Sequence, residues 1–258
     1  MADRTIRTVV VDGVVIGEGS PKILVPITGD TPERLRAQAD ALTGRPVDVV
    51  EWRADHFGAL ADTAAVVAAA RMLTERLGGK PLLFTCRTTT EGGEAEIDDE
   101  AYGELNIAVA ESGTVGLVDV ECERRRDVVE RVLSAAHACG VFVIASNHDF
   151  AGTPAKEEIV GRLRAMQRLG ADICKIAVMP HSAADVLTLL DATRTMHEEH
   201  ADRPLITMSM GGLGVVSRLA GRVFGSAATF GMVGTPSAPG QIDVDDLHTA
   251  LRLLEQAG

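Results

Sequence analysis

Two side chains of this sequence could together form and use a Schiff base. Lys175 lies in the apolar run Ile173-Cys-Lys-Ile-Ala-Val178, and lysine is almost never buried without a partner. A neutral lysine amine can attack a carbonyl carbon and form an imine. His148 is the only one of seven histidines at the carboxyl end of an expected strand, where it could transfer protons near neutral pH. Taken singly, Lys175 could be a salt-bridged structural residue and His148 a surface loop residue; together they favour catalysis.

Other charged residues could serve this pair. We expect Arg53, Arg87 and Arg218 to lie near Lys175 and to favour its neutral amine through like-charge repulsion. Glu91, in the loop after Arg87, could orient the histidine.

The glycine-rich stretch 211–214 leads into an expected helix. Arg218 falls about one turn into that helix, a position that suits a substrate carboxylate or phosphate. The stretch does not match a dinucleotide-binding loop, because Ser217 stands where the pattern needs a further glycine.

Alternating strands and helices must position these residues. The expected strands cover residues 22–28, 47–53, 81–87, 115–121, 141–147, 172–178, 204–210 and 226–230. Helices are expected at 32–42, 63–77, 100–111, 128–139, 156–169, 183–197 and 244–254. Eight such units in 258 residues predict an α/β fold, a (β/α)8 TIM barrel that forms a single domain over 1–258. A doubly wound open sheet is the alternative.

Two local signals add detail to this fold. Residues 1–20 are expected to form an accessory β-hairpin with Asp12-Gly13 at its turn. Thr31-Pro32 and Thr153-Pro154 each match a capping residue followed by proline at the first helical position.

Side-chain alternation gathers the polar residues at one end of the barrel. Glu51 and Arg53 share a face, while Trp52 between them points toward the helices; Lys175 likewise shares its face with Ala177. The active site of a TIM barrel forms at the carboxyl ends of its strands. The residues near those ends are Thr28, Glu51, Arg53, Arg87, Asp119, Glu121, His148, Lys175, Met208, Met210 and Phe230.

The segment 232–241 follows the last expected strand and is rich in proline and glycine. It could be a plain connector or a lid over the barrel mouth. As a lid, it would offer the side chains of Ser237 and Gln241 to substrate hydroxyls or a carboxylate.

Composition disfavours several classes of function. The chain has 37 acidic and 25 basic residues and a formal net charge of −12, which argues against binding to nucleic acid. No apolar run approaches the roughly 20 residues that span a membrane, and the N-terminus lacks the apolar segment of a signal peptide. The four cysteines form no CxxC pair, which favours reduced thiols in a cytoplasm. No HxH or HExxH motif occurs, so no catalytic metal is expected.

An ordered set of short motifs carries a family resemblance. The chain resembles type I 3-dehydroquinate dehydratase, the Schiff-base enzyme of the shikimate pathway, nearly from end to end. The matching segments are Glu51-Trp-Arg-Ala-Asp-His56, Pro81-Leu-Leu-Phe-Thr-Cys-Arg87, Glu91-Gly-Gly, Ser146-Asn-His-Asp-Phe150, Lys175-Ile-Ala-Val-Met-Pro180, Ile206-Thr-Met-Ser-Met210, Ser217-Arg-Leu-Ala-Gly221, Val223-Phe-Gly-Ser-Ala-Ala-Thr-Phe-Gly231 and Ser237-Ala-Pro-Gly-Gln241.

The resemblance implies a TIM barrel whose N-terminal hairpin closes the lower end, usually as a homodimer. It implies dehydration of 3-dehydroquinate, a small-molecule substrate, to 3-dehydroshikimate without a cofactor. Lys175 matches the lysine that condenses with the ketone, His148 the residue that transfers protons, and Glu91 the carboxylate that orients it. Arg218 matches the clamp on the substrate carboxylate. Residues that match the other substrate contacts are Glu51, Arg53, Arg87, Ser237 and Gln241, with Met210 and Phe230 as apolar walls.

Some positions and alternatives stay open. Pro26 stands where some relatives carry a serine that contacts substrate, so neither it nor Thr28 is assigned a role. Asp119 and Glu121 could support the lysine or the histidine, and nothing firmer is assigned to them. Another Schiff-base barrel, such as an aldolase, would share the lysine but not the histidine and the lid together. A non-catalytic sensor of quinate-pathway metabolites should have lost one of the two catalytic side chains.

Overall fold

The computed structural model describes residues 6–257, and its centre is a ring of eight parallel strands. These are β3 (Lys22–Ile27), β4 (Val49–Arg53), β5 (Leu82–Thr85), β6 (Leu117–Glu121), β7 (Phe142–Asp149), β8 (Ile173–Val178), β9 (Leu205–Ser209) and β10 (Ala228–Met232). Ladders join them in chain order from β3 to β9, and β10 pairs with β3. A parallel bridge between Leu205 and Ser226 brings β10 beside β9 and completes the ring. The TIM barrel is confirmed and the open sheet was wrong.

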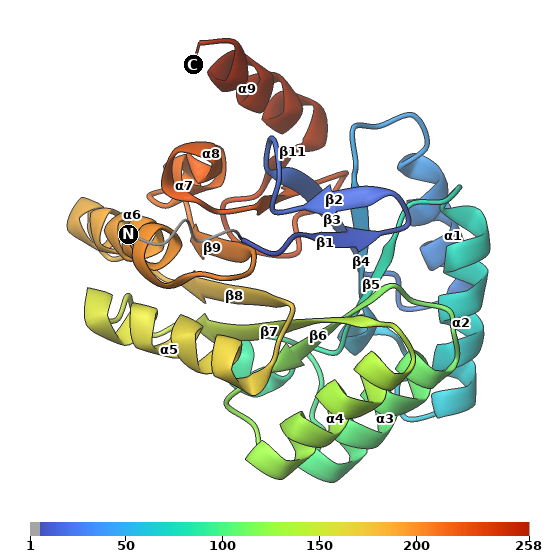
Figure 1. Ribbon diagram of the computed structural model, residues 1–258. Helices are drawn as coiled ribbons and strands as arrows, with labels where there is room; N and C mark the ends of the chain where they lie inside the picture. The colour runs from blue at the N-terminus through green and yellow to red at the C-terminus, as the bar shows by residue number, and fades with distance from the viewer. Residues whose placement is uncertain (1–5, 258) are drawn as a thin grey trace.

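Helices form the outer layer of the barrel (Figure 1). The long ones are α1 (Pro32–Ala41), α2 (Thr63–Arg76), α3 (Asp99–Glu111), α4 (Arg126–Ala138), α5 (Lys156–Leu169), α6 (Ala183–Thr195) and α9 (Val244–Gln256). Short helical segments are η1 (Ala54–His56), η2 (Thr89–Glu91), η3 (Met196–His200), α7 (Val215–Leu219) and α8 (Gly221–Phe224), and β11 (Ile242–Asp243) pairs with β10.

Of the two expected helix starts, one is confirmed. Helix α1 begins at Pro32, and the Thr31 hydroxyl accepts a hydrogen bond from the Arg34 backbone N–H. Helix α5 covers the expected range, Lys156–Leu169, but Ala155 caps it and Pro154 is not its first residue. The expected capping role of Thr153 was wrong because its hydroxyl donates instead to the Met179 carbonyl oxygen.

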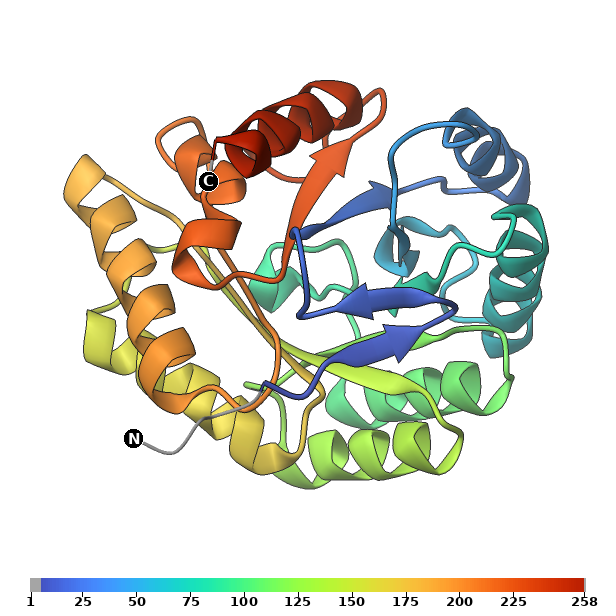
Figure 2. The ribbon, with the colours of Figure 1, turned by 45° about the horizontal axis from the view of Figure 1, so that its top comes forward.

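The N-terminal hairpin closes the amino-terminal end of the barrel. It consists of β1 (Val9–Val11) and β2 (Val14–Ile16), joined by a two-residue turn in which Asp12 and Gly13 have φ values of 46° and 83°. Residues 1–5 of the expected hairpin region lie outside the described residues. Figure 2 shows the two strands lying across the barrel. Their inward side chains pack in one cluster with the barrel interior, formed by Val9, Val11, Ile16, Leu24, Val49, Leu83, Leu117, Ile144, Ile173 and Ile206.

The alternation of faces along the strands is as expected. Trp52 is fully buried between the sheet and the helices, with Phe57 and Phe84 edge-on to its ring. Cys174 packs in the helix layer, while Ala177 packs in the barrel interior. Because the apolar interior fills the lower barrel, the polar residues that share its faces are left at the carboxyl ends of the strands.

Candidate active site

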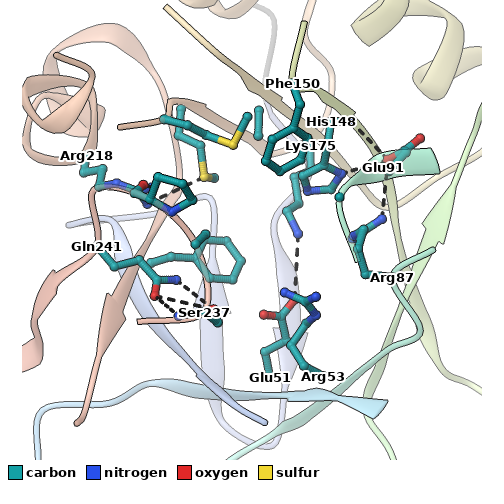
Figure 3. A pocket seen from close by; sticks show the side chains of 17 residues that line it. Glu51, Arg53, Arg87, Glu91, His148, Phe150, Lys175, Arg218, Ser237 and Gln241 are labelled. Carbon is teal, nitrogen blue, oxygen red and sulfur yellow. Dashed lines mark hydrogen bonds and ion pairs between the residues drawn. The ribbon is translucent and has the colours of Figure 1, made fainter. Parts of the chain in front are cut away.

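One cavity opens at the carboxyl ends of the strands, and it gathers every residue that the sequence assigned to the site (Figure 3). It encloses about 110 Å³. The eleven predicted residues that line it are Glu51, Arg53, Arg87, Glu91, His148, Lys175, Met210, Arg218, Phe230, Ser237 and Gln241. Six further residues complete the lining, namely Gly92, Phe150, Ala177, Met208, Ala238 and Pro239.

The Lys175 side chain is buried and held by carboxylates. Its Nζ donates a hydrogen bond to Asp119 Oδ2 at 3.0 Å and lies 3.8 Å from Glu51 Oε1. It also lies 4.8 Å from the centre of the Phe230 ring, close enough for a cation–π contact.

The expected arginine neighbours of Lys175 require a correction. Arg87 shares the Asp119 carboxylate with Lys175, and Arg53 is paired with Asp55. The carboxylates nearest to the amine are those of Asp119 and Glu51. The amine of the unliganded protein is therefore paired with anions. The cations on neighbouring strands could be read from the sequence, but the acids that neutralise them could not.

His148, near the end of β7, and Glu91, in η2, form a largely buried pair. The Nδ1 atom of His148 lies 2.8 Å from Glu91 Oε2, which also accepts the His148 backbone N–H at 3.0 Å. Burial, Arg87 and Lys175 hold the pKa of His148 well below its usual value. Burial likewise raises the pKa of Glu91 to about 8, although Arg87 opposes it. With Nδ1 turned to Glu91, the Nε2 atom is free to act on a substrate.

Arg87 ties three strands together beneath the cavity. Its guanidinium donates to Asp119 Oδ1 at 2.6 Å, to Glu121 Oε1 at 3.0 Å and to the Ser146 hydroxyl at 3.1 Å. Arg53 is fixed separately by a two-bond pair with Asp55, at 2.6 and 2.8 Å. Both cations therefore have rigid positions before a substrate arrives.

Arg218 is the exception among the buried cations of the site. It is 1% exposed, and no carboxylate within residues 6–257 forms an ion pair with it. Its guanidinium donates to the Pro239 carbonyl oxygen at 3.0 Å and lies 3.7 Å from Met208 Sδ. Burial alone lowers the pKa of Arg218 to about 10. A buried, unpaired guanidinium that faces a cavity is suited to a ligand carboxylate.

Known proteins are similar to this chain over nearly its whole length. The family described as Type I 3-dehydroquinase matches residues 23–257. The chain belongs to this family. It is 53% identical over 251 residues to the 3-dehydroquinate dehydratases of Shigella boydii and of Escherichia coli strain SE11, which covers 97% of this chain and 100% of each relative.

Solved structures of the family have the same fold. The type I 3-dehydroquinate dehydratase of Clostridium difficile matches with a TM-score of 0.96 and 46% identity, over 98% of this chain and 100% of that one. The enzyme of Geobacillus kaustophilus matches with a TM-score of 0.93 and 40% identity, over 98% of both chains.

The family establishes the reaction. A type I 3-dehydroquinate dehydratase is a lyase that converts 3-dehydroquinate to 3-dehydroshikimate through a lysine Schiff base, the third step of the shikimate pathway. This chain is such an enzyme, as the motifs of the sequence indicated. The aldolase and sensor alternatives were wrong.

The segment after β10 covers the cavity of this dehydratase. Ser237 and Gln241 bond each other across the turn, with the Gln241 Oε1 accepting the Ser237 backbone N–H at 2.8 Å. The segment rests on the loop after β9, where the Gly211 backbone N–H donates to the Pro239 carbonyl oxygen at 3.2 Å. A Cβ at Gly240, which has a φ of 77°, would lie 2.4 Å from the Gly211 carbonyl oxygen. The close approach requires glycine.

Sequence reasoning missed several supporting contacts. Asp119 received no firm role, although it joins Lys175 to Arg87 and to Ser146. Tyr102 is fully buried, and its hydroxyl accepts the Glu121 backbone N–H at 3.0 Å. A tyrosine in an amphipathic helix carries no signal for such a contact.

The two open positions of the first barrel strand lie outside the cavity lining. Pro26 is buried beside Glu51 in the β3–β4 ladder. The Thr28 backbone N–H donates to Gln38 Oε1 at 2.9 Å. Neither residue lines the cavity.

No group of three or more His, Cys, Asp or Glu side chains within residues 6–257 could hold a metal ion. No helix in those residues is long and apolar enough to cross a membrane.

Proposed function

We propose that Lys175 is the residue that forms the Schiff base, that His148 transfers the protons and that Glu91 orients His148. The observation that supports this assignment is the position of both side chains at one cavity, with the unpaired Arg218 across from them (Figure 3). A substrate whose carboxylate binds Arg218 would therefore present its ring to Lys175 and His148.

The chemistry of the step suits these side chains. The iminium draws electrons from its neighbouring carbon, so the adjacent C–H becomes acidic enough for a neutral imidazole. His148 takes that proton at Nε2, and Glu91 stabilises the imidazolium through Nδ1. The imidazolium then gives a proton to the departing hydroxyl group, which leaves as water. Hydrolysis of the iminium releases the unsaturated ketone and restores the amine.

The remaining lining residues are proposed to hold the substrate. The charged heads of Glu51, Arg53 and Arg87 lie on the Lys175 side and suit ring hydroxyls. Ser237 and Gln241 lie on the Arg218 side and suit the carboxylate and its neighbouring hydroxyl (Figure 3). Met210 and Phe230 supply apolar walls that exclude water from the iminium.

Trapping of the covalent intermediate tests these roles. Borohydride reduction in the presence of 3-dehydroquinate should add a ligand-sized mass to the peptide that contains Lys175. The Lys175→Met variant should gain no mass, and His148→Ala should form the adduct but release product slowly. An adduct on any other lysine would refute the assignment.

We further propose that the chain acts as one domain, as a homodimer and in a cytoplasm, with no cofactor. The common core of the hairpin and the barrel supports one domain. The family resemblance supports the dimer and the absence of a cofactor. The four cysteines are free thiols, which supports a reducing compartment. Sedimentation at several protein concentrations tests the dimer, and a monomer at every concentration would refute it.

A further inference from the structure

Asp119 is an anion buried behind the cavity, in the interior of the barrel. It is 1% exposed, lies on β6 and is not part of the cavity lining. Oδ2 accepts from Lys175 Nζ at 3.0 Å, and Oδ1 accepts from Arg87 and from the Ser146 hydroxyl, each at 2.6 Å. Donors on β7, on β8 and just after β5 therefore fix both oxygens.

Asp119 is placed to remain an anion throughout the reaction. Burial raises the pKa of Asp119, but Arg87 and Lys175 outweigh burial and hold it below its usual value. Such a carboxylate is a poor proton acceptor and a good counter-ion. Glu51 differs, because its Oε1 is 3.8 Å from Nζ and the side chain lines the cavity on the substrate side.

The charge on the reacting nitrogen makes a fixed counter-ion useful. An ammonium and a ketone combine to give an iminium and water, so that one C=N bond replaces one C=O bond. Two of the three N–H protons leave with the carbonyl oxygen as that water, and the positive charge stays on nitrogen. One N–H remains on the iminium and still needs an acceptor.

We propose that Asp119 is the fixed counter-ion of the nitrogen at which the imine forms. Before attack it anchors Nζ and sets the direction from which the amine meets the ketone. After attack it accepts the one remaining N–H, which fixes the plane of the C=N bond relative to His148. The inference rests on the proposed role of Lys175 and adds to it a partner on β6.

Glu121 offers a matched control on the same strand. It is as buried as Asp119, at 1% exposed, and its Oε1 accepts from Arg87 at 3.0 Å, yet no contact joins it to Lys175 among the described residues. Asp119→Asn and Glu121→Gln therefore each remove one buried negative charge beside Arg87. Only the first removes the partner of the reacting nitrogen.

The test is single-turnover formation of the covalent adduct at saturating 3-dehydroquinate, quenched with borohydride and measured by mass. Asp119→Asn should slow adduct formation about 100-fold at saturating substrate, with a change in KM similar to that of Glu121→Gln because both carboxylates hold Arg87. Glu121→Gln should change KM through Arg87 and slow adduct formation less than about tenfold. Asp119→Glu, which keeps the charge, should recover part of the rate.

Equal slowing in Asp119→Asn and Glu121→Gln would overturn the proposal, as would an unchanged rate in folded Asp119→Asn. If Asp119→Asn does not fold, Ser146→Ala removes one bond to Asp119 and one to Arg87 and leaves the charge of Asp119 in place. That variant should slow adduct formation severalfold at saturating substrate, and the wild-type rate would overturn the proposal. An absence of adduct in the wild-type enzyme would instead refute the role of Lys175.

Discussion

Replacement of Arg218 by methionine should make the unliganded enzyme more stable and much less active. The guanidinium is 1% exposed and burial alone depresses its pKa to about 10. Each pKa unit corresponds to about 1.4 kcal/mol, so the charged form costs about 3 kcal/mol in the folded protein. Methionine is unbranched and apolar and can occupy the same space without this cost.

The expected gain is smaller than that cost. The variant loses the hydrogen bond from Arg218 to the Pro239 carbonyl oxygen, and such a bond is worth about 1 kcal/mol. A net gain of about 2 kcal/mol should remain, which corresponds to a rise of roughly 4–8 °C in the melting temperature. Calorimetry of the unliganded protein measures it.

Lys175→Met provides the matched control, because it also exchanges a buried cation for methionine. Lys175 is paired with Asp119 at 3.0 Å, so its removal leaves a buried anion without one partner. We expect a loss of about 3 kcal/mol in the free energy of unfolding. The two substitutions should therefore change stability in opposite directions.

The activity of Arg218→Met should fall as its stability rises. A two-bond contact between a guanidinium and a carboxylate supplies about 3 kcal/mol or more, so kcat/KM should decrease at least 100-fold. The change should be mostly in KM if the clamp holds the ground state and the transition state equally. A less stable Arg218→Met protein, or one that keeps kcat/KM within about threefold, would refute the reasoning.

Two further predictions concern the proton-transfer pair and the lid. Glu91 has a raised pKa of about 8, and once ionised it accepts Nδ1–H of His148 and leaves Nε2 free as a base. The value of kcat/KM should therefore rise with pH through about 8 and reach a plateau above it. Glu91→Gln should lose this rise, and a flat profile in the wild-type enzyme would contradict the assignment. Gly240→Ala puts a Cβ 2.4 Å from the Gly211 carbonyl oxygen and should displace the segment 232–241 from the cavity. KM should then rise about tenfold or more with an unchanged melting temperature. An unchanged KM would show that this segment need not rest on Gly211.

The strands and their faces could be predicted from the sequence because both depend on local pattern. All eight barrel strands begin and end within two residues of the expected limits. The predicted alternation of side chains is also confirmed, since Trp52 points toward the helices while Glu51 and Arg53 line the cavity. The eleven residues predicted for the site line one cavity because each one either ends a strand or belongs to a family motif.

The contacts between side chains could not be predicted in the same way. Asp119 and Lys175 are brought together by barrel closure, and periodicity along one strand does not give the partner across the interior. The sequence pattern also did not predict α7 and α8 as two helices, because five and four residues are too few to show a helical period. The error about the charges around Lys175 has the same origin.

With the proposed substrate contacts, the distribution of charge in the cavity favours one orientation of the substrate. Lys175, Arg53 and Arg87 are each neutralised by carboxylates on one side. Arg218, on the other side, lacks a carboxylate partner among residues 6–257 (Figure 3). A ring with one carboxylate therefore meets an uncompensated cation in only one direction, and in that direction its far side faces the amine. A carboxylate partner for Arg218 within the protein would remove the preference for this orientation of the substrate. The unfavourable burial of an unpaired guanidinium is therefore what allows Arg218 to orient the substrate.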